Sequence, residues 1–130
     1  MEIQKKQFTY KGKTIEELKN LDTREFARYL KSRQKRTALR QFQKIEKFID
    51  RSNKKIKNNK KIKTHERDLI IVPKMIGMKI QVYNGNKFLP VDITEEMLGH
   101  RFGEFALTRG KVKHSKAGIG ATKGTKSKAK

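Results

Sequence analysis

The apolar residues in the N-terminal part of the chain recur at helical spacing between residues 14 and 50. They fall into three groups: Ile15 and Leu18; Phe26, Tyr29 and Leu30; and Ala38, Phe42, Ile45 and Ile49, the last at intervals of 4, 3 and 4 residues. An apolar residue at every third or fourth position gives a helix one face to bury. The pattern therefore predicts helices near residues 14–20, 22–32 and 36–51.

Two capping boxes support the first two helices. Thr14 is followed three residues later by Glu17, and Asp22 is followed by Glu25. Such a pair satisfies free backbone amides at a helix N-terminus, because each side chain accepts a hydrogen bond from the other residue's amide. Residues 31–37 contain four basic residues and no apolar one, so we expect a bend or a loop there.

Residues 52–63 contain six lysines and no acidic residue. Like charges at this density repel one another, and too little apolar surface is present to offset the entropy of the chain. We therefore expect a loosely ordered linker that an anion would neutralise.

The apolar period changes from helical to extended between residues 68 and 92. Residues 69–72 are a run of four apolar residues before Pro73, and Ile80 and Val82 alternate with polar neighbours, as in a half-buried strand. Asn84-Gly85 is a strong hairpin signal, and residues 88–91 supply the returning strand. Pro90 cannot donate a ladder hydrogen bond, which favours an edge position for that strand.

Thr94 is placed to open a short helix that Gly99 closes. The predicted fold is thus α+β: N-terminal helices, then a small three-stranded antiparallel sheet with a short helix, then a basic C-terminal tail that is disordered when free. Residues 109–130 contain Arg109, seven lysines and no acidic residue. We divide the chain into a basic helical region with its linker (1–63), an α+β core (64–108) and a basic extension (109–130).

The charge of the chain points to a polyanionic partner. There are 34 Lys and Arg against 13 Asp and Glu, a formal net charge of +21. We expect Arg33, Arg36 and Arg40 to act as fork-shaped phosphate donors on a helix. RNA is favoured because no DNA-binding motif is legible, but a DNA-condensing, chromatin-type protein is the alternative.

The composition argues against cofactors, metals and catalysis. No cysteine is present, and the three histidines, at 65, 100 and 114, are too far apart to pre-form a metal site. Adjacent glutamates at 16–17 and 95–96 are typical of helix first turns. We expect no enzyme, although an RNA-processing enzyme using His100 remains a third hypothesis. The longest apolar run has four residues and no leader is visible, so we expect a cytoplasmic protein without a membrane span.

Residues 71–109 contain a specific set of motifs: Asn84-Gly85, Gly99-His100-Arg101-Phe102, Gly103-Glu104-Phe105 and Thr108 at fixed spacing. This text closely resembles the family of the nineteenth protein of the small ribosomal subunit. Lys113-His114 and the Gly-Ile-Gly-Ala-Thr sequence at 118–122 are similar to its archaeal and eukaryotic branch. The resemblance covers about residues 64–122.

The resemblance implies a structural protein bound to ribosomal RNA in the head of the small subunit. It also implies the thirteenth protein of that subunit as a neighbour and a tail that runs toward the decoding site and its transfer RNA. Carried onto this chain, it puts the following residues on or near RNA: Lys74, Lys79, Asn84, Lys87, His100, Arg101 and Arg109, with Lys111, Lys113, His114 and Lys116 in the tail.

Overall fold

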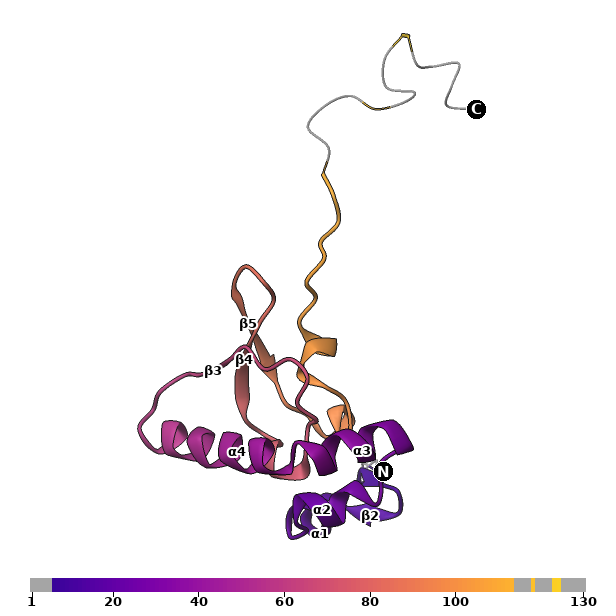
Figure 1. Cartoon of the computed structure of the whole chain (residues 1–130), viewed down its shortest axis with the longest axis vertical. Helices are drawn as coiled ribbons and strands as arrows, with labels where there is room; N and C mark the ends of the chain where they lie inside the picture. Colours follow the sequence, from indigo (N-terminus) through magenta and orange to yellow (C-terminus); the bar gives the residue numbers. More distant parts are fainter. Residues whose placement is uncertain (1–5, 114–117, 119–122, 125–130) are drawn as a thin grey trace, which may run out of the picture.

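The structure, a computed structural model, describes residues 6–113, 118 and 123–124. Its N-terminal half is mainly helical. The elements are β1 (Thr9–Tyr10), β2 (Lys13–Thr14), α1 (Ile15–Lys19), α2 (Thr23–Ala27), α3 (Ser32–Arg40) and α4 (Phe42–Lys57). Figure 1 shows α3 and α4 end to end, with the main sheet on one side of this pair and α1 and α2 on the other.

Both predicted capping boxes are present. The amide of Thr14 donates to Glu17 at 3.2 Å, and the amide of Asp22 donates to Glu25 at 3.1 Å. Ahead of them, β1 and β2 form a hairpin that the sequence did not predict. Its two loop residues, Lys11 and Gly12, have φ values of 51° and 79°, which is typical of the type I′ turn that joins strands most tightly.

The expectation of a bend or loop at residues 31–37 is wrong. The α2 helix already ends at Ala27, and α3 starts at Ser32 and runs through the basic stretch. Within α3 only Ala38 is buried. The segment therefore forms a mostly polar helix without a continuous apolar stripe. The predicted helix at 36–51 is therefore divided between α3 and α4.

The expectation of a loose linker at 52–63 is also wrong. The α4 helix continues to Lys57 because Ser52, only 1% exposed, extends the buried stripe of Ile45, Phe48 and Ile49 by one more turn. A Schellman motif then ends it: Lys60 N–H donates to the Lys55 carbonyl at 2.8 Å, with Asn59 in the left-handed region at φ 52°.

The main sheet has three strands, as predicted, but it is mixed rather than antiparallel. It consists of β3 (Ile62–Thr64), β4 (Lys79–Tyr83) and β5 (Phe88–Asp92) in that order. β4 pairs in parallel with β3 and in antiparallel with β5, and Pro90 lies on the edge strand β5 as expected. Between β4 and β5, Asn84 Oδ1 accepts hydrogen bonds from the amides of Asn86 and Lys87 and shapes the hairpin turn.

The apolar run at 69–72 is buried but is not a strand of the sheet. It crosses the core between β3 and η1 (Pro73–Met75). Its backbone pairs instead with the segment around Arg101: Ile71 N–H donates to the His100 carbonyl at 2.8 Å, and Ile70 forms an isolated bridge with Arg101. β3 takes the place in the sheet that the sequence assigned to this run.

Two short 3₁₀ turns complete the body, η2 (Glu95–Met97) and η3 (Phe102–Phe105). The first is the short helix predicted after Thr94. The hydrophobic core draws on residues from Leu18 to Ala106, while the division of the chain at residues 63 and 108 stays a prediction. Residues 107–113 are exposed and contain no helix or strand; the remainder of the expected tail, apart from 118 and 123–124, lies outside the described residues.

Candidate nucleic-acid interface

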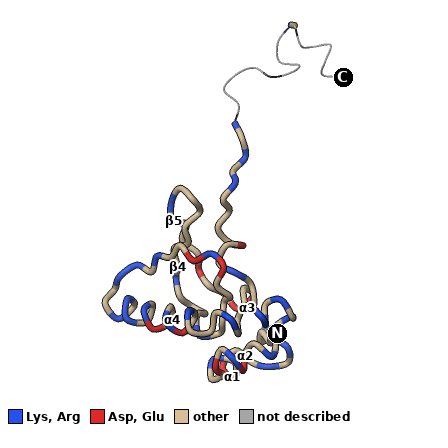
Figure 2. The backbone as a smooth tube through the Cα atoms, in the orientation of Figure 1, with Lys and Arg blue, Asp and Glu red and all other residues tan. Residues whose placement is uncertain are grey.

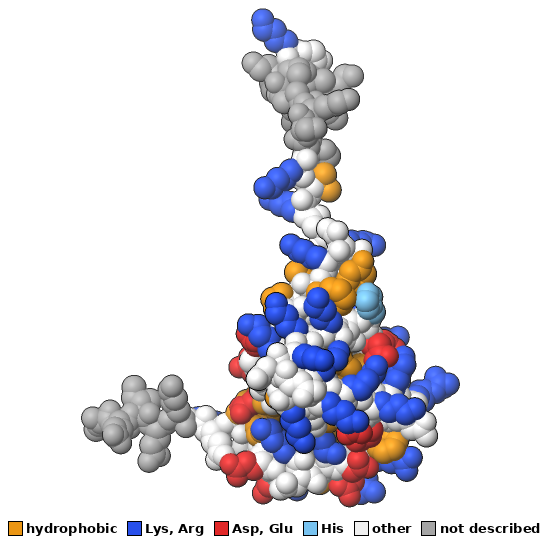
Figure 3. Space-filling view, turned by 90° about the vertical axis from the view of Figure 1, so that its left-hand side faces the viewer, with side chains coloured by type: hydrophobic (Ala, Val, Ile, Leu, Met, Phe, Trp, Pro, Cys, Tyr) orange, Lys and Arg blue, Asp and Glu red, His pale blue; other side chains and the backbone are white. Residues whose placement is uncertain are grey.

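Cations cover α3, α4 and the segment that leads to the tail (Figure 2). Figure 3 shows a face on which blue side chains outnumber red ones and on which hydrophobic side chains gather near the root of the tail. A surface of this kind attracts phosphates and releases their counterions.

Arg33, Arg36 and Arg40 lie on α3 with their side chains exposed. Their spacing of three and four residues places them on one side of the helix, which we call the arginine face of α3. Ala38 points the other way and is 1% exposed in the core. Three guanidinium groups on a rigid helix present matched phosphate donors, so the geometry agrees with the expected role, which stays a prediction.

Three of the expected RNA contacts are paired with carboxylates. Lys74 Nζ lies 3.9 Å from Glu46 Oε1, Lys79 Nζ lies 4.0 Å from Asp92 Oδ1, and His100 Nδ1 lies 2.5 Å from Glu104 Oε2. The Lys79–Asp92 pair is exposed, and such pairs contribute only about 0–1 kcal/mol, so exchange of this carboxylate for a phosphate costs little. Glu46 is half-buried and also accepts a hydrogen bond from Thr23 Oγ1 at 2.6 Å, so Lys74 is held more firmly.

Two expected contacts use their side chains for hydrogen bonds within the protein. Asn84 uses its side-chain oxygen to hold the β4–β5 turn. Arg101 is half-buried, and its Nη2 donates to Thr37 Oγ1 at 3.0 Å, which ties the start of η3 to α3. These contacts give both residues a structural role, and their contact with RNA stays a prediction.

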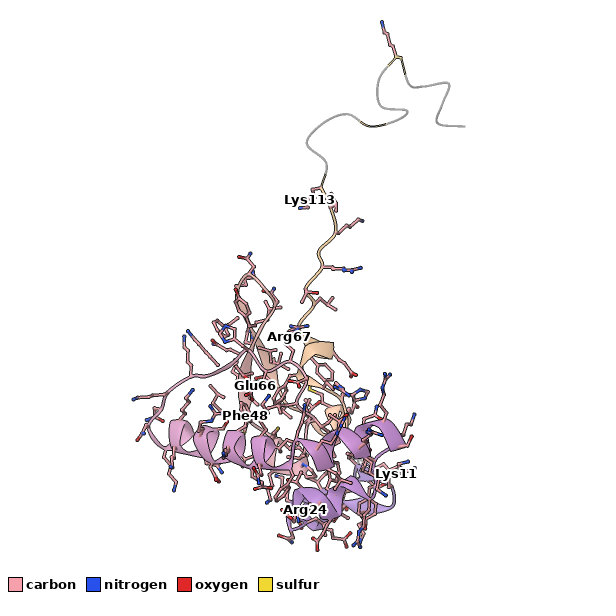
Figure 4. The ribbon with its side chains drawn as sticks, in the orientation of Figure 1. Lys11, Arg24, Phe48, Glu66, Arg67 and Lys113 are labelled. Atoms are coloured by element: carbon pink, nitrogen blue, oxygen red, sulfur yellow. The ribbon has the colours of Figure 1, made fainter. Side chains whose placement is uncertain are left out.

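The remaining expected residues lie at projecting parts of the molecule. Lys87 is exposed in the hairpin turn, and Arg109, Lys111 and Lys113 are exposed along the segment leading away from the body. Figure 4 shows Lys113 far from the sheet and helices. His114 and Lys116 lie outside the described residues.

Arg67 has a structural role that reasoning from the sequence missed. Its guanidinium donates to three backbone carbonyls: Nη1 to Tyr83 at 2.7 Å, and Nη2 to Gly103 at 2.9 Å and Ala106 at 2.5 Å. Figure 4 shows Arg67 between the sheet and the segment that leads to the tail. The sequence offered one signal, Gly103, whose missing side chain leaves room for this close approach.

A cluster of three rings, each in contact with the other two, lies at the hairpin end of the sheet and was also missed. His65 follows β3, Tyr83 ends β4 and Phe88 begins β5; their centroids lie 4.5 Å (His65–Tyr83) and 5.1 Å (His65–Phe88 and Tyr83–Phe88) apart. We call this cluster the ring row. Lys63 Nζ lies 5.3 Å from the Phe88 centroid. Rings on a sheet beside cations form a surface on which unpaired bases can stack.

The described residues contain no group of His, Asp and Glu that could hold a metal ion. Within the same residues, no helix is both long and apolar enough to cross a membrane.

Comparison with known proteins gives one consistent result. The family model described as "Ribosomal protein S19" matches residues 28–114. "Small ribosomal subunit protein uS19" of Methanocella arvoryzae is 46% identical over 123 residues, which cover 94% of this chain and 86% of the relative. The protein of the same description from Picrophilus torridus is 43% identical over 122 residues, covering 93% of this chain and 79% of the relative.

Proposed function

Because the chain belongs to the ribosomal protein S19 family, we propose that it binds ribosomal RNA in the head of the small subunit. It is a structural constituent of the small ribosomal subunit and not an enzyme. The observation that carries the proposal is the family match over residues 28–114, which includes the arginine face of α3, the whole main sheet and both 3₁₀ turns after it.

The proposal includes two further partners. The tail, residues 109–130, reaches toward the decoding site and contacts transfer RNA, and the body lies beside the thirteenth protein of the small subunit. Support for the first comes from the exposed Arg109, Lys111 and Lys113, which lead away from the body. Chemical cross-linking in assembled subunits tests both neighbours.

Footprinting of small-subunit ribosomal RNA tests the main proposal. Wild-type protein should protect nucleotides of the head, and replacement of Arg33, Arg36 and Arg40 by Gln should remove part of that protection. A matched control replaces Lys11, Lys19 and Arg28, which are also exposed, and changes the charge equally. Equal loss in both variants would show that only total charge matters.

The alternative, a DNA-condensing protein, makes a different prediction. A simple polycation binds duplex DNA and folded RNA with similar affinity at the same salt, because counterion release dominates both. A strong preference for ribosomal RNA over duplex DNA at equal salt therefore supports the ribosomal function, and equal affinity contradicts it.

A further inference from the structure

Two residues that line the same cavity each carry a buried side-chain oxygen without a partner. Within the described part of the chain, the buried side-chain polar atoms without a hydrogen-bond partner are Gln41 Oε1, Ser52 Oγ and Glu66 Oε2. Ser52 and Glu66 both line a cavity of about 270 Å³ between α4 and β3. A buried polar group without a partner is destabilising, so two in one cavity indicate a polar ligand.

The donors of this cavity suit a phosphate group. Arg51 and Lys55 of α4 and Lys63 of β3 line it beside the Ser52 hydroxyl, which is 1% exposed. Arg51 uses Nε for a hydrogen bond to the Lys47 carbonyl at 3.4 Å, and a guanidinium carries five N–H donors in all. One hydroxyl and three cations around a small cavity favour an anion.

Glu66 restricts the choice of anion, because its carboxylate repels a second negative charge placed against it. Its Oε1 lies 4.0 Å from Lys44 Nζ, and its Oε2 has no partner. A carboxylate oxygen accepts a hydrogen bond readily from a hydroxyl. The cavity therefore suits a ligand that carries both a phosphate and a hydroxyl, such as a ribose phosphate.

The cavity is small, and a ring cluster beside it offers a separate place for a base. Its volume lies just below the roughly 300–1,000 Å³ that is typical of small-molecule pockets. The ring row lies directly beside it, because His65 belongs to both and Lys63 lines the cavity while facing Phe88. Figure 4 shows Phe48 and Glu66 in the region where α4 faces the sheet.

We propose that this site binds one ribonucleotide of an unpaired RNA strand, with its sugar and phosphate in the cavity and its base stacked on the ring row. Ser52, Arg51, Lys55 and Lys63 bind the phosphate, and Glu66 Oε2 accepts the 2′-hydroxyl hydrogen. The assignment rests on the proposed function, because ribosomal RNA would supply the unpaired strand. It gives the protein a means to select unpaired RNA that net charge alone does not supply.

Three probes of equal length and charge test the site on the full chain. They are single-stranded oligomers of about four units: oligoadenylate RNA, its DNA counterpart, and an abasic ribose phosphate. The polycationic background is the same for all three, so affinity differences measured by fluorescence anisotropy at one salt concentration report base and sugar recognition. We expect wild type to bind the oligoadenylate roughly 5- to 100-fold more tightly than the abasic oligomer.

Variants of the ring row should lose the base preference alone. His65→Ala and Phe88→Leu should bring oligoadenylate close to the abasic oligomer and leave the salt dependence unchanged. Phe42→Leu is the matched control, since this ring faces Arg24 in another part of the molecule. If the base preference is absent in wild type, or survives in both ring-row variants, the stacking assignment is overturned.

Variants of the cavity should lose phosphate and sugar recognition. Ser52→Ala should lower RNA affinity severalfold without lowering the unfolding temperature, because it removes a hydroxyl that has no partner in the free protein. Ser32→Ala, on exposed α3, is its control. Glu66→Gln should reduce the preference for RNA over the DNA oligomer, whereas Glu16→Gln should not. Unchanged values in both cavity variants overturn the assignment.

The proposed function and this site fail differently. A protein that protects head ribosomal RNA normally while every cavity and ring-row variant matches wild type contradicts the site only. A wild-type protein that fails to bind small-subunit ribosomal RNA contradicts the function, whatever the short probes show.

Discussion

Arg67 and Gly103 are joined by two reciprocal hydrogen bonds. The amide of Gly103 donates to the Arg67 carbonyl at 2.8 Å, and Arg67 Nη2 donates to the Gly103 carbonyl at 2.9 Å. The same guanidinium also holds the carbonyls of Tyr83 and Ala106. One side chain therefore connects the end of β4, the η3 turn and the residue before the exposed segment, and fixes the direction in which the tail leaves the body.

Arg67→Lys should destabilise the protein. A lysine ammonium cannot reproduce the planar fork, so at least one half-buried carbonyl loses its charged donor. We expect the free energy of unfolding, measured in urea, to fall by roughly 2–4 kcal/mol. Arg28→Lys, on an exposed position of the N-terminal helices, is the control and should change little. Equal stabilities for the two variants would contradict this role.

Gly103→Ala should also destabilise. A Cβ at this position would lie 3.1 Å from the Arg67 carbonyl oxygen and 3.3 Å from Arg67 Nη2. Relief of this crowding moves the guanidinium away from its acceptors, and overpacking of this kind costs roughly 1–3 kcal/mol. Gly110→Ala meets nothing within 4 Å and is the matched control in the same thermal unfolding experiment.

The helices show what an apolar period can and cannot predict. The first two start at their capping boxes because the cap is encoded within four residues. The end of α4 could not be found in this way, because its last buried turn depends on Ser52, a polar residue. The structure buries Ser52 against an element, β3, whose three residues are too few to show a strand period.

The candidate interface, too, could be predicted only in part from the sequence. Exposed cations such as Arg36 and Lys87 follow from composition and position, because charged side chains favour water. The inward direction of Arg101 depends on Thr37, which only the folded chain brings close, whereas the Asn84 hydrogen bonds lie within the hairpin turn that the sequence predicts. The ring row could not be predicted from the sequence, because the parallel pairing of β3 with β4 is what brings His65 beside Tyr83.

Thr37→Val separates the two roles of Arg101. The substitution removes the acceptor at 3.0 Å but leaves the guanidinium in place. We expect a loss of about 1 kcal/mol in unfolding free energy with little change in RNA affinity, whereas Arg101→Gln should lower both. Both variants are measured by urea unfolding and by binding to small-subunit ribosomal RNA. If Arg101→Gln leaves RNA affinity unchanged, its role is structural alone.

Tyr10 should make the protein less stable at alkaline pH. Burial raises the pKa of its phenol above the ordinary value of 10.0, because the charged phenolate is poorly solvated there. The folded protein therefore holds this proton more tightly than the unfolded chain. The associated stability is present below pH 10 and is lost as the pH rises toward the folded-state pKa.

Comparison of wild type with Tyr10→Phe isolates this effect from the lysines, which also titrate at high pH. The unfolding free energy of the variant should fall less steeply between about pH 9 and 11. Tyr29→Phe serves as the control for loss of a phenol. Parallel curves for wild type and Tyr10→Phe would contradict the assignment.

Deletion of residues 110–130 should separate folding from binding. No residue of the described core lies beyond Ala106, so the unfolding transition should stay cooperative with its midpoint nearly unchanged. The deletion removes seven lysines, and each lost phosphate contact reduces the slope of log affinity against log salt by roughly 0.7–0.9. We therefore expect weaker binding to ribosomal RNA and a markedly shallower slope.

A variant with the seven lysines replaced by Gln keeps the length of the tail and distinguishes the effect of its charge from that of other chain contacts. If this variant keeps the wild-type slope while the deletion does not, the tail acts through contacts other than its lysine charges. Loss of cooperative unfolding in the deletion would show that the tail is part of the folded body.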